Sequence, residues 1–254
     1  MSARRAAARW PAAPIALLLL VGAAAPAAAQ QPVLTSRLSS VVGSFVVGYS
    51  TLGDGGSFNE TLRTLDAAFS RDEADAGGVN GFVGSTPVQG NASFGVTQDY
   101  AITPLLISAS GSGATGADTP FSYVSVGAQT ISQVRLSFTV AVPTPYVLTG
   151  EVTHSIGAPV LGLMPTASAF ARLVGSPGGG GAWLSTSTPG AFSTSGTFMP
   201  GFTYELEGRA NSNLNASSQF TMNLALSPVP EPAQAALLAL GLGLVALRAR
   251  ARRG

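Results

Sequence analysis

Apolar and polar residues alternate along several stretches in the middle of the chain. The alternation is clearest over 134–142, where Val, Leu or Phe occupies every second position and Arg, Ser, Thr or Ala lies between. A period of two predicts a β-strand with one buried and one solvated face. Similar alternation predicts strands over 121–126, 146–152, 202–209 and 219–226, and an apolar, β-branched run predicts another over 41–49.

Clusters rich in Gly, Pro and Ser separate these strands, at 110–119, 176–181 and 187–190. Short alternating strands between such turns predict an all-β fold, an antiparallel β-sandwich or jelly-roll-like body over residues 30–227. We expect the last two strands to form a hairpin across 210–218 that ends just before the C-terminal tail.

One segment, 59–76, breaks the strand pattern. Ser57 and Glu60 have the spacing of a helix-capping box, and Gly77 could end a helix. Leu62, Leu65 and Phe69 have the spacing of residues on one face of a helix. We therefore expect a helix or a helical turn here, with a pair of strands carrying outward charges as the alternative.

The N-terminal residues 1–29 have the three parts of a secretory signal peptide. Three Arg precede residue 10, an apolar stretch covers 12–25, and small residues follow up to Ala29. Ala27 and Ala29 form an A-x-A site, which predicts cleavage after Ala29. An uncleaved anchor helix is the alternative.

The C-terminal residues 228–254 also have three parts. Val229, Pro230, Glu231 and Pro232 precede an apolar run over 233–247, and the chain ends in a cluster formed by Arg248, Arg250, Arg252 and Arg253. As a helix the 15-residue run would be about 22 Å long, against a bilayer core of about 30 Å. We therefore expect a short, marginal transmembrane helix, with the Arg cluster held on the inner side.

The order of these three parts resembles the PEP-CTERM sorting signal of exported proteins of Gram-negative bacteria. The resemblance covers only 228–254. It implies processing near Pro230, Glu231 and Pro232 by an exosortase, which releases the body or transfers it to the cell surface. It also implies an association with exopolysaccharide and biofilm growth, and the same tail occurs on some ice-binding proteins. A plain single-pass anchor is the alternative.

Composition narrows the function of the body. Charged residues make up 10% of the chain, which contains no Cys and one His. Thiol catalysis and Cys-ligated metal sites are therefore excluded. Residues 30–230 hold six Arg against eleven Asp or Glu, a net charge of −5. This charge argues against nucleic acid as a partner.

The ionisable residues of the body suggest only weak candidates for catalysis. Glu205 and Glu207 lie two apart on a predicted strand, as a glycoside hydrolase could use, but we expect that strand face to be exposed. His154 follows Glu151 by three residues, but alternation places it beside Val152, which predicts a half-buried, hydrogen-bonded His. We predict no catalytic residue.

Two further patterns could bind a ligand. Asp72, Glu73 and Asp75 are acidic enough for calcium but lack the order of a calcium loop, so a solvated acidic face is the preferred interpretation. Aromatic side chains could stack on sugars, although single aromatics in a sandwich belong more often to the core. The aromatic candidates are Tyr123, Tyr146, Trp183 and Tyr204.

Together these patterns predict an exported, non-enzymatic surface or matrix protein without a cofactor or metal. Its expected partners are signal peptidase, the exosortase, the inner membrane during transit, and extracellular polysaccharide. A carbohydrate-binding module is the main alternative. A glycoside hydrolase is a weaker alternative, because the face with Glu205 and Glu207 is expected to be exposed. An ice-binding protein is also weaker, because no Thr-x-Thr repeat recurs at a fixed period.

Overall fold

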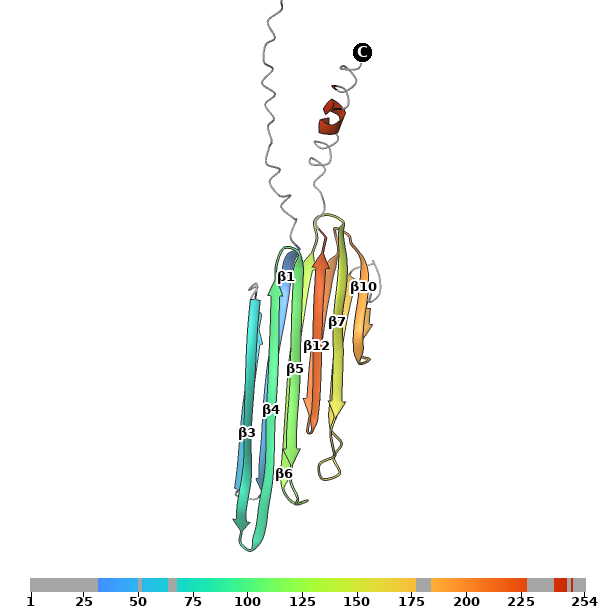
Figure 1. The fold of residues 1–254 in the computed structure, drawn as a ribbon. Coiled ribbons are helices and arrows are strands. Elements are labelled where there is room, and N and C mark those ends of the chain that lie inside the picture. The colour runs from blue at the N-terminus through green and yellow to red at the C-terminus, as the bar shows by residue number, and fades with distance from the viewer. Residues whose placement is uncertain are drawn as a thin grey trace, which may run out of the picture. The chain divides into compact units, whose positions relative to one another are not determined.

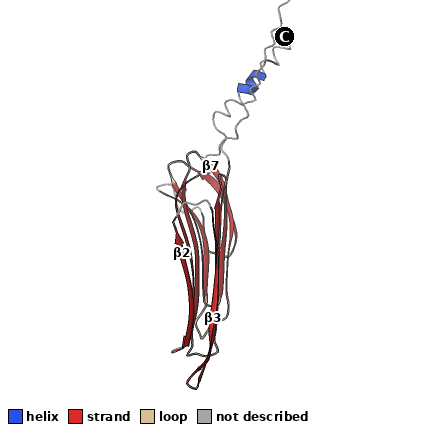
Figure 2. Ribbon diagram, turned by 90° about the vertical axis from the view of Figure 1, so that its left-hand side faces the viewer, coloured by secondary structure: helices blue, strands red, loops and turns tan. Residues whose placement is uncertain are grey.

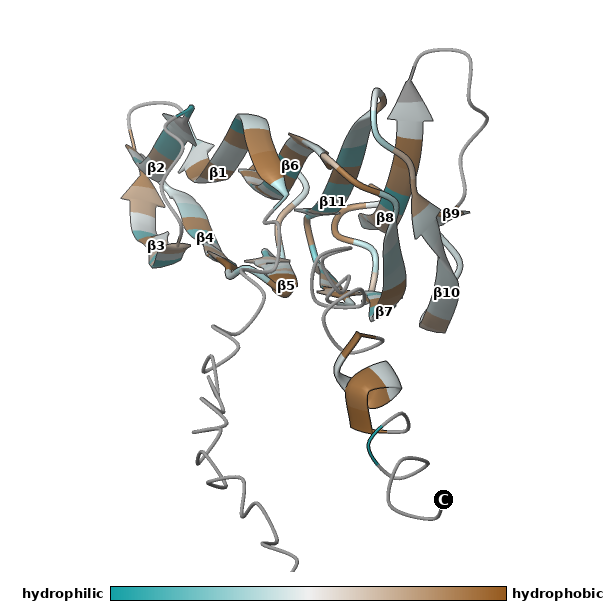
Figure 3. Cartoon of the chain, turned by 90° about the horizontal axis from the view of Figure 1, so that it is seen from above, coloured by the Kyte–Doolittle hydropathy of each residue, from teal (hydrophilic) through white to brown (hydrophobic). Residues whose placement is uncertain are grey.

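Two antiparallel β-sheets pack face to face in the part of the chain that follows the predicted signal peptide (Figure 1). The computed structural model describes residues 32–49, 52–63, 68–176, 184–227, 240–245 and 248. Residues 29–229 form one compact unit, called the body below. The first sheet has the strand order β2-β1-β6-β11-β8-β9 and the second has β10-β7-β12-β5-β4-β3. A view along the strands separates these two layers (Figure 3).

The strands of the first sheet are β1 (Val33–Tyr49), β2 (Leu52–Leu62), β6 (Ser125–Thr139), β8 (Thr166–Ser176), β9 (Leu184–Thr186) and β11 (Thr203–Asn213). Those of the second are β3 (Ala68–Val83), β4 (Thr86–Ile102), β5 (Leu106–Asp118), β7 (Thr144–Ile156), β10 (Gly190–Phe198) and β12 (Ala216–Leu226). All paired strands are antiparallel, so the predicted all-β sandwich is confirmed (Figure 2).

Alternating side chains build the core between the sheets. On β6, Val134, Leu136 and Phe138 are fully buried, while the residues between them stay partly exposed. Two apolar clusters result, one around Phe138 and Phe220 and the other around Phe45 and Phe94.

A polar layer also lies in the interior of the sandwich. Gln98 is fully buried; its amide donates to the Gln133 carbonyl at 2.7 Å and accepts from the Ser39 hydroxyl at 3.1 Å. The Ser212 hydroxyl donates to the Gly113 carbonyl at 2.9 Å and contacts that of Ser218 at 2.8 Å. These bonds replace those that the buried polar groups would make with water.

The last strand and the longest hairpin point to opposite ends of the sandwich (Figure 1). β12 ends at Leu226, where the Ser227 N–H donates to the Pro145 carbonyl at 2.9 Å. The end of the sandwich at which β12 ends is called the tail end. The β3–β4 hairpin, the end of β1 and the loop 119–124 form the distal end. β1 has 17 residues, so the two ends are roughly 55 Å apart.

The described residues of 59–76 form no helix; they lie in two strands, as in the alternative, but these strands belong to different sheets and do not pair with each other. Residues 52–62 form β2 and pair with β1, and residues 68–83 form β3 and pair with β4; residues 64–67 lie outside the described part. Glu60, expected to cap a helix, instead forms an ion pair with Arg71 across the two strands. Pairing of these two stretches with β1 and β4 outweighs the helical spacing.

The expected closing hairpin is wrong in its pairing, although both of its strands exist. β11 pairs with β6 and β8 in the first sheet, whereas β12 pairs with β5 and β7 in the second. The chain crosses between the sheets at Leu214, whose backbone adopts φ 60°. The physical reason is that both strands bury one apolar face, and the crossing places these faces against each other.

The tail is described only over 240–245 and at Arg248, where the backbone is helical and exposed. Within the described part of the chain, no helix is long and apolar enough to cross a membrane.

Candidate functional site

The predicted processing sites fall almost entirely outside the described residues. This holds for Ala27 and Ala29, for Val229, Pro230, Glu231 and Pro232, and for Arg250, Arg252 and Arg253. Arg248 is described and exposed. The signal peptide and the sorting signal therefore stay predictions.

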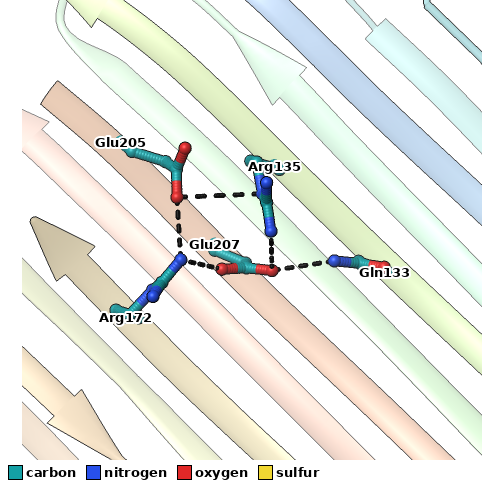
Figure 4. A network of polar contacts seen from close by, with 5 residues as sticks. All are labelled: Gln133, Arg135, Arg172, Glu205 and Glu207. Carbon is teal, nitrogen blue, oxygen red and sulfur yellow. Dashed lines mark hydrogen bonds and ion pairs between the residues drawn. The ribbon is translucent and has the colours of Figure 1, made fainter. Parts of the chain in front are cut away.

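Glu207 lies at the centre of an ion-pair network on the outer face of the first sheet (Figure 4). The register places it on β11 between Arg135 of β6 and Arg172 of β8. One carboxylate oxygen accepts from Arg135 at 2.9 Å and from Gln133 at 2.8 Å, and the other accepts from Arg172. Arg172 also donates to Glu205 at 2.8 Å. Two Arg thus balance two Glu across three adjacent strands.

The network determines the protonation of Glu207. Burial alone would raise the pKa of this carboxyl, but the hydrogen bonds from Arg135 and Gln133 and the charges of Arg135 and Arg172 outweigh burial and lower the pKa. The same hydrogen bond to Glu207 raises the pKa of Arg135. A carboxylate held ionised in this way is a poor general acid.

The expectation that Glu205 and Glu207 share an exposed face is wrong for Glu207, which is only 3% exposed. The alternation itself is correct, since Tyr204 and Leu206 face the core. The paired Arg side chains lie over the carboxylate and cover it. Strand patterns from the sequence do not reveal this covering, because its Arg residues come from two other strands.

His154 and Glu151 do not form a catalytic pair. Both lie on β7, where Val152 and His154 have the inward parity and Glu151 is exposed on the outer face. His154 is half-buried, as predicted. Its Nδ1 has no hydrogen-bond partner among the described residues, so the predicted hydrogen bond is not found at that nitrogen.

The acidic residues of β3 lie on both of its faces, Asp72 on one and Glu73 and Asp75 on the other. Asp72 and Asp75 are exposed and Glu73 is half-buried. Asp75 accepts from the Ala76 N–H at 2.9 Å, and among the described residues no group of three or more His, Cys, Asp or Glu could hold a metal ion.

Asp75 takes part in a reciprocal contact between the edge strands of the two sheets. Its carboxylate occupies the space where a Cβ of Gly56 on β2 would lie, and Asp54 on β2 occupies the same space at Gly77 on β3. Asp54 also accepts from the Gly78 N–H at 3.1 Å. We call Asp54, Gly56, Asp75 and Gly77 the edge clasp, which holds β2 and β3 together where the sandwich would otherwise be open.

Of the aromatic candidates, Tyr146 and Tyr204 belong to the core, at 5% and 1% exposure. Trp183 lies outside the described residues. Tyr123 is 40% exposed at the distal end. Its ring contacts Phe121 and Tyr49, with centroids 5.3 and 5.2 Å away, and its hydroxyl donates to the Pro87 carbonyl at 2.6 Å.

Tyr49 and Tyr123 border a groove that the sequence did not reveal. It runs over the outer face of the first sheet at the distal end, as two hollows of about 720 and 480 Å³ that share Val46 and Gly55. We call it the distal groove. Its other principal lining residues are Ser44, Gly48, Leu52, Gly53, Ser57, Ser125, Gly127, Gln129 and Asn213.

A second hollow, of about 590 Å³, lies on the second sheet. Small and polar side chains from β3, β4, β5 and β12 line it, among them Ser70, Asp99, Ser110, Thr221 and Asn223. Its two aromatic residues stack on each other: Tyr100 is 3% exposed, and Phe69 is partly buried.

Comparison with protein-family models found no family that matches this chain, and a search of curated proteins found no similar sequence.

Proposed function

We propose that this protein is exported and sorted to the cell surface through its C-terminal tail, where the body has a structural or adhesive role. The observation that carries the proposal is the order of parts in 228–254: a Pro-Glu-Pro motif, a short apolar run and a terminal Arg cluster. In this proposal signal peptidase cleaves after Ala29, and an exosortase acts near Glu231.

The end of the body supports access to the motif. β12 ends at Leu226, three residues before Val229, and Ser227 is still bonded to the body through Pro145. Pro230 and Pro232 fix their own φ angles and disfavour helix in the residues before them. A processing enzyme that binds extended backbone would meet the motif directly after the last strand.

The apolar run supports transient rather than permanent anchoring. Its 15 residues, 233–247, are fewer than the roughly 20 that usually span a bilayer. The flanking Arg cluster would hold it on the inner side until the exosortase removes it.

The geometry of the two strongest catalytic candidates, Glu207 and the pair of His154 and Glu151, supports a non-enzymatic role. Both oxygens of Glu207 are bound to Arg or Gln side chains, and His154 and Glu151 lie on opposite faces of β7. Neither arrangement offers an acid and a base to one substrate.

The proposal is tested by following the protein in cells with and without the exosortase. We expect normal cells to yield an exported form that begins at Gln30 and lacks the residues after the motif, measured by intact mass. Replacement of Pro230, Glu231 and Pro232 by Ala, or deletion of the exosortase, should leave the full tail on the protein and retain it in the inner membrane.

Pro228→Ala is the matched control, because this Pro lies outside the motif; its processing should be normal. An exported form that still ends at Gly254, or identical handling in cells lacking the exosortase, would contradict the proposal.

A further inference from the structure

The floor of the distal groove consists largely of glycine. Successive strands place Ser125, Gly48 and Gly53 in one row across β6, β1 and β2, and Gly127, Val46 and Gly55 in the next. Val46, in the middle, is 54% exposed. The groove is therefore hollow because the residues around Val46 lack side chains.

Packing does not require glycine at two of these four positions, Gly53 and Gly127, whereas a Cβ at Gly48 or Gly55 would lie a tight 3.3 Å from a backbone oxygen. A Cβ at Gly53 or Gly127 would meet its nearest atom at 3.5 Å, an ordinary van der Waals distance, and neither residue has a positive φ. In the core, by contrast, a Cβ at Gly43 would overlap the ring of Phe94, and one at Gly208 the ring of Phe220. Glycine inside a strand lowers stability. Where a larger residue would fit, it is typical of a surface that a ligand approaches closely.

The aromatic wall of the groove is held in place by the protein. Phe121 stacks on Tyr123 at an interplanar angle of 15°, Tyr49 packs against it at 58°, and the Tyr123 hydroxyl is bonded to Pro87. A ligand that uses the exposed part of the Tyr123 ring would not have to order it first, which lowers the cost of binding.

The chemistry of the lining points to an uncharged ligand with many hydroxyl groups. Ser44, Ser57, Gln129 and Asn213 form the row next to Gly127, Val46 and Gly55, and with Ser125 they offer polar but uncharged groups. Asp54 is the one charged residue among the described lining residues, and its carboxylate accepts from the N–H groups of Gly55 and Gly78. An acidic polymer would find no cation here and would meet a body of net charge −5.

We propose that the distal groove binds a neutral polysaccharide, with sugar rings lying over the Val46 and glycine floor and against Tyr123. Apolar faces of the rings would contact the floor and the aromatic wall, and their hydroxyls would bond to the polar residues beside the glycines. A polysaccharide-binding role for a surface protein rests on the export proposed above. The binding is measured in vitro with purified protein, so the binding proposal and the export proposal can fail independently.

The test uses the full-length protein in detergent and two groups of probes. The neutral probes are cellulose, a β-1,3-glucan and a galactomannan, and the acidic probes are alginate and polygalacturonate. We expect binding to at least one neutral probe, by affinity electrophoresis and calorimetry, and none to the acidic ones. Gly53→Val and Gly127→Val should each lower affinity about tenfold or more, with an unchanged or higher Tm because Val favours strands.

Gly95→Val is the matched control on the outer face of the second sheet, where a Cβ would meet only Ala74 at 4.0 Å. Its affinity should equal that of the unaltered protein. Tyr123→Phe, which keeps the ring, should retain most of the binding, and Tyr123→Ala should lose about tenfold. Absence of binding to every neutral probe, preference for an acidic one, or equal affinity of the valine variants and the control would each overturn the proposal.

Discussion

At the scale of single residues, Glu207 combines deep burial with complete pairing. A buried carboxylate without partners would lose its charge, because burial disfavours the ionised form. Arg135, Arg172 and Gln133 reverse that preference, so the lowered pKa reflects their contacts. The network thereby links three strands of the first sheet through side chains as well as through the backbone ladder.

Glu207 should make stability depend on pH. Its pKa is lowered in the folded state from an ordinary 4.5, so its contribution is fully present above that value and is lost as pH falls through the folded-state pKa. Glu207→Gln should destabilise the protein by about 2 kcal/mol at pH 7, and the difference should shrink in acid. Urea unfolding of both proteins between pH 7 and 3 measures this; a difference that stays constant with pH would contradict it.

The edge clasp predicts the effect of a single methyl group. A Cβ at Gly56 would overlap the Asp75 carboxylate and crowd the Phe45 ring, so Gly56→Ala should lower the free energy of unfolding by about 1–3 kcal/mol. Gly95→Ala is the control and should be neutral or slightly stabilising, since that Cβ has space. Thermal unfolding compares Gly56→Ala with Gly95→Ala. Equal Tm values would mean that Asp75 and Phe45 can move aside without loss of stability.

At the scale of elements, the crossing from β11 to β12 determines which sheet each strand joins. Asn215 holds this corner: its side-chain oxygen accepts from the Ala117 N–H at 2.6 Å, and its amide donates to the Ala158 carbonyl at 3.2 Å. Its own carbonyl accepts from the Gly157 N–H at 2.6 Å. One residue thus joins the corner to β5 and to the segment after β7.

Asn215→Ala should weaken this corner without changing the fold. Loss of both side-chain bonds should cost about 1–2 kcal/mol and speed amide hydrogen exchange at Ala117. Asn223→Ala, on the exposed face of β12, is the control and should change neither quantity. Unchanged exchange at Ala117 in Asn215→Ala would show that the corner is held by the backbone alone.

At the scale of the whole molecule, the body is a separate folding unit. The twelve strands of the described residues lie between Val33 and Leu226, and residues 29–229 cluster as one compact unit. The buried residues of both core clusters lie within this unit, between Val41 and Leu226.

A chain of residues 30–227 should accordingly fold by itself. We expect one cooperative thermal transition with a Tm within a few degrees of that of the full-length protein, followed by circular dichroism. Limited proteolysis of the full-length protein should yield a resistant fragment close to these limits, identified by mass. A truncated chain without a cooperative transition would contradict this view of the body.

The sequence by itself located several strands and their buried faces, because alternation depends on neighbours along the chain. It was wrong over 110–119, an expected turn that lies almost wholly in β5, and over 121–124, which form a loop and no strand. Alternation over 134–142 correctly marked the buried side of β6, and the last two strands were located closely. Helical spacing over 59–76 failed because a local pattern does not include the pairing of β2 with β1 and of β3 with β4.

Only the tertiary structure decided which strands share a sheet, how Glu207 is covered and where the distal groove lies. The lining of that groove comes from residues within 44–49, 52–57 and 123–129 and from Asn213, which are adjacent only after the strands have paired. Whether a strand glycine is required by packing depends in the same way on what its neighbours in space leave empty. Such contacts are non-local, and no spacing along the chain encodes them.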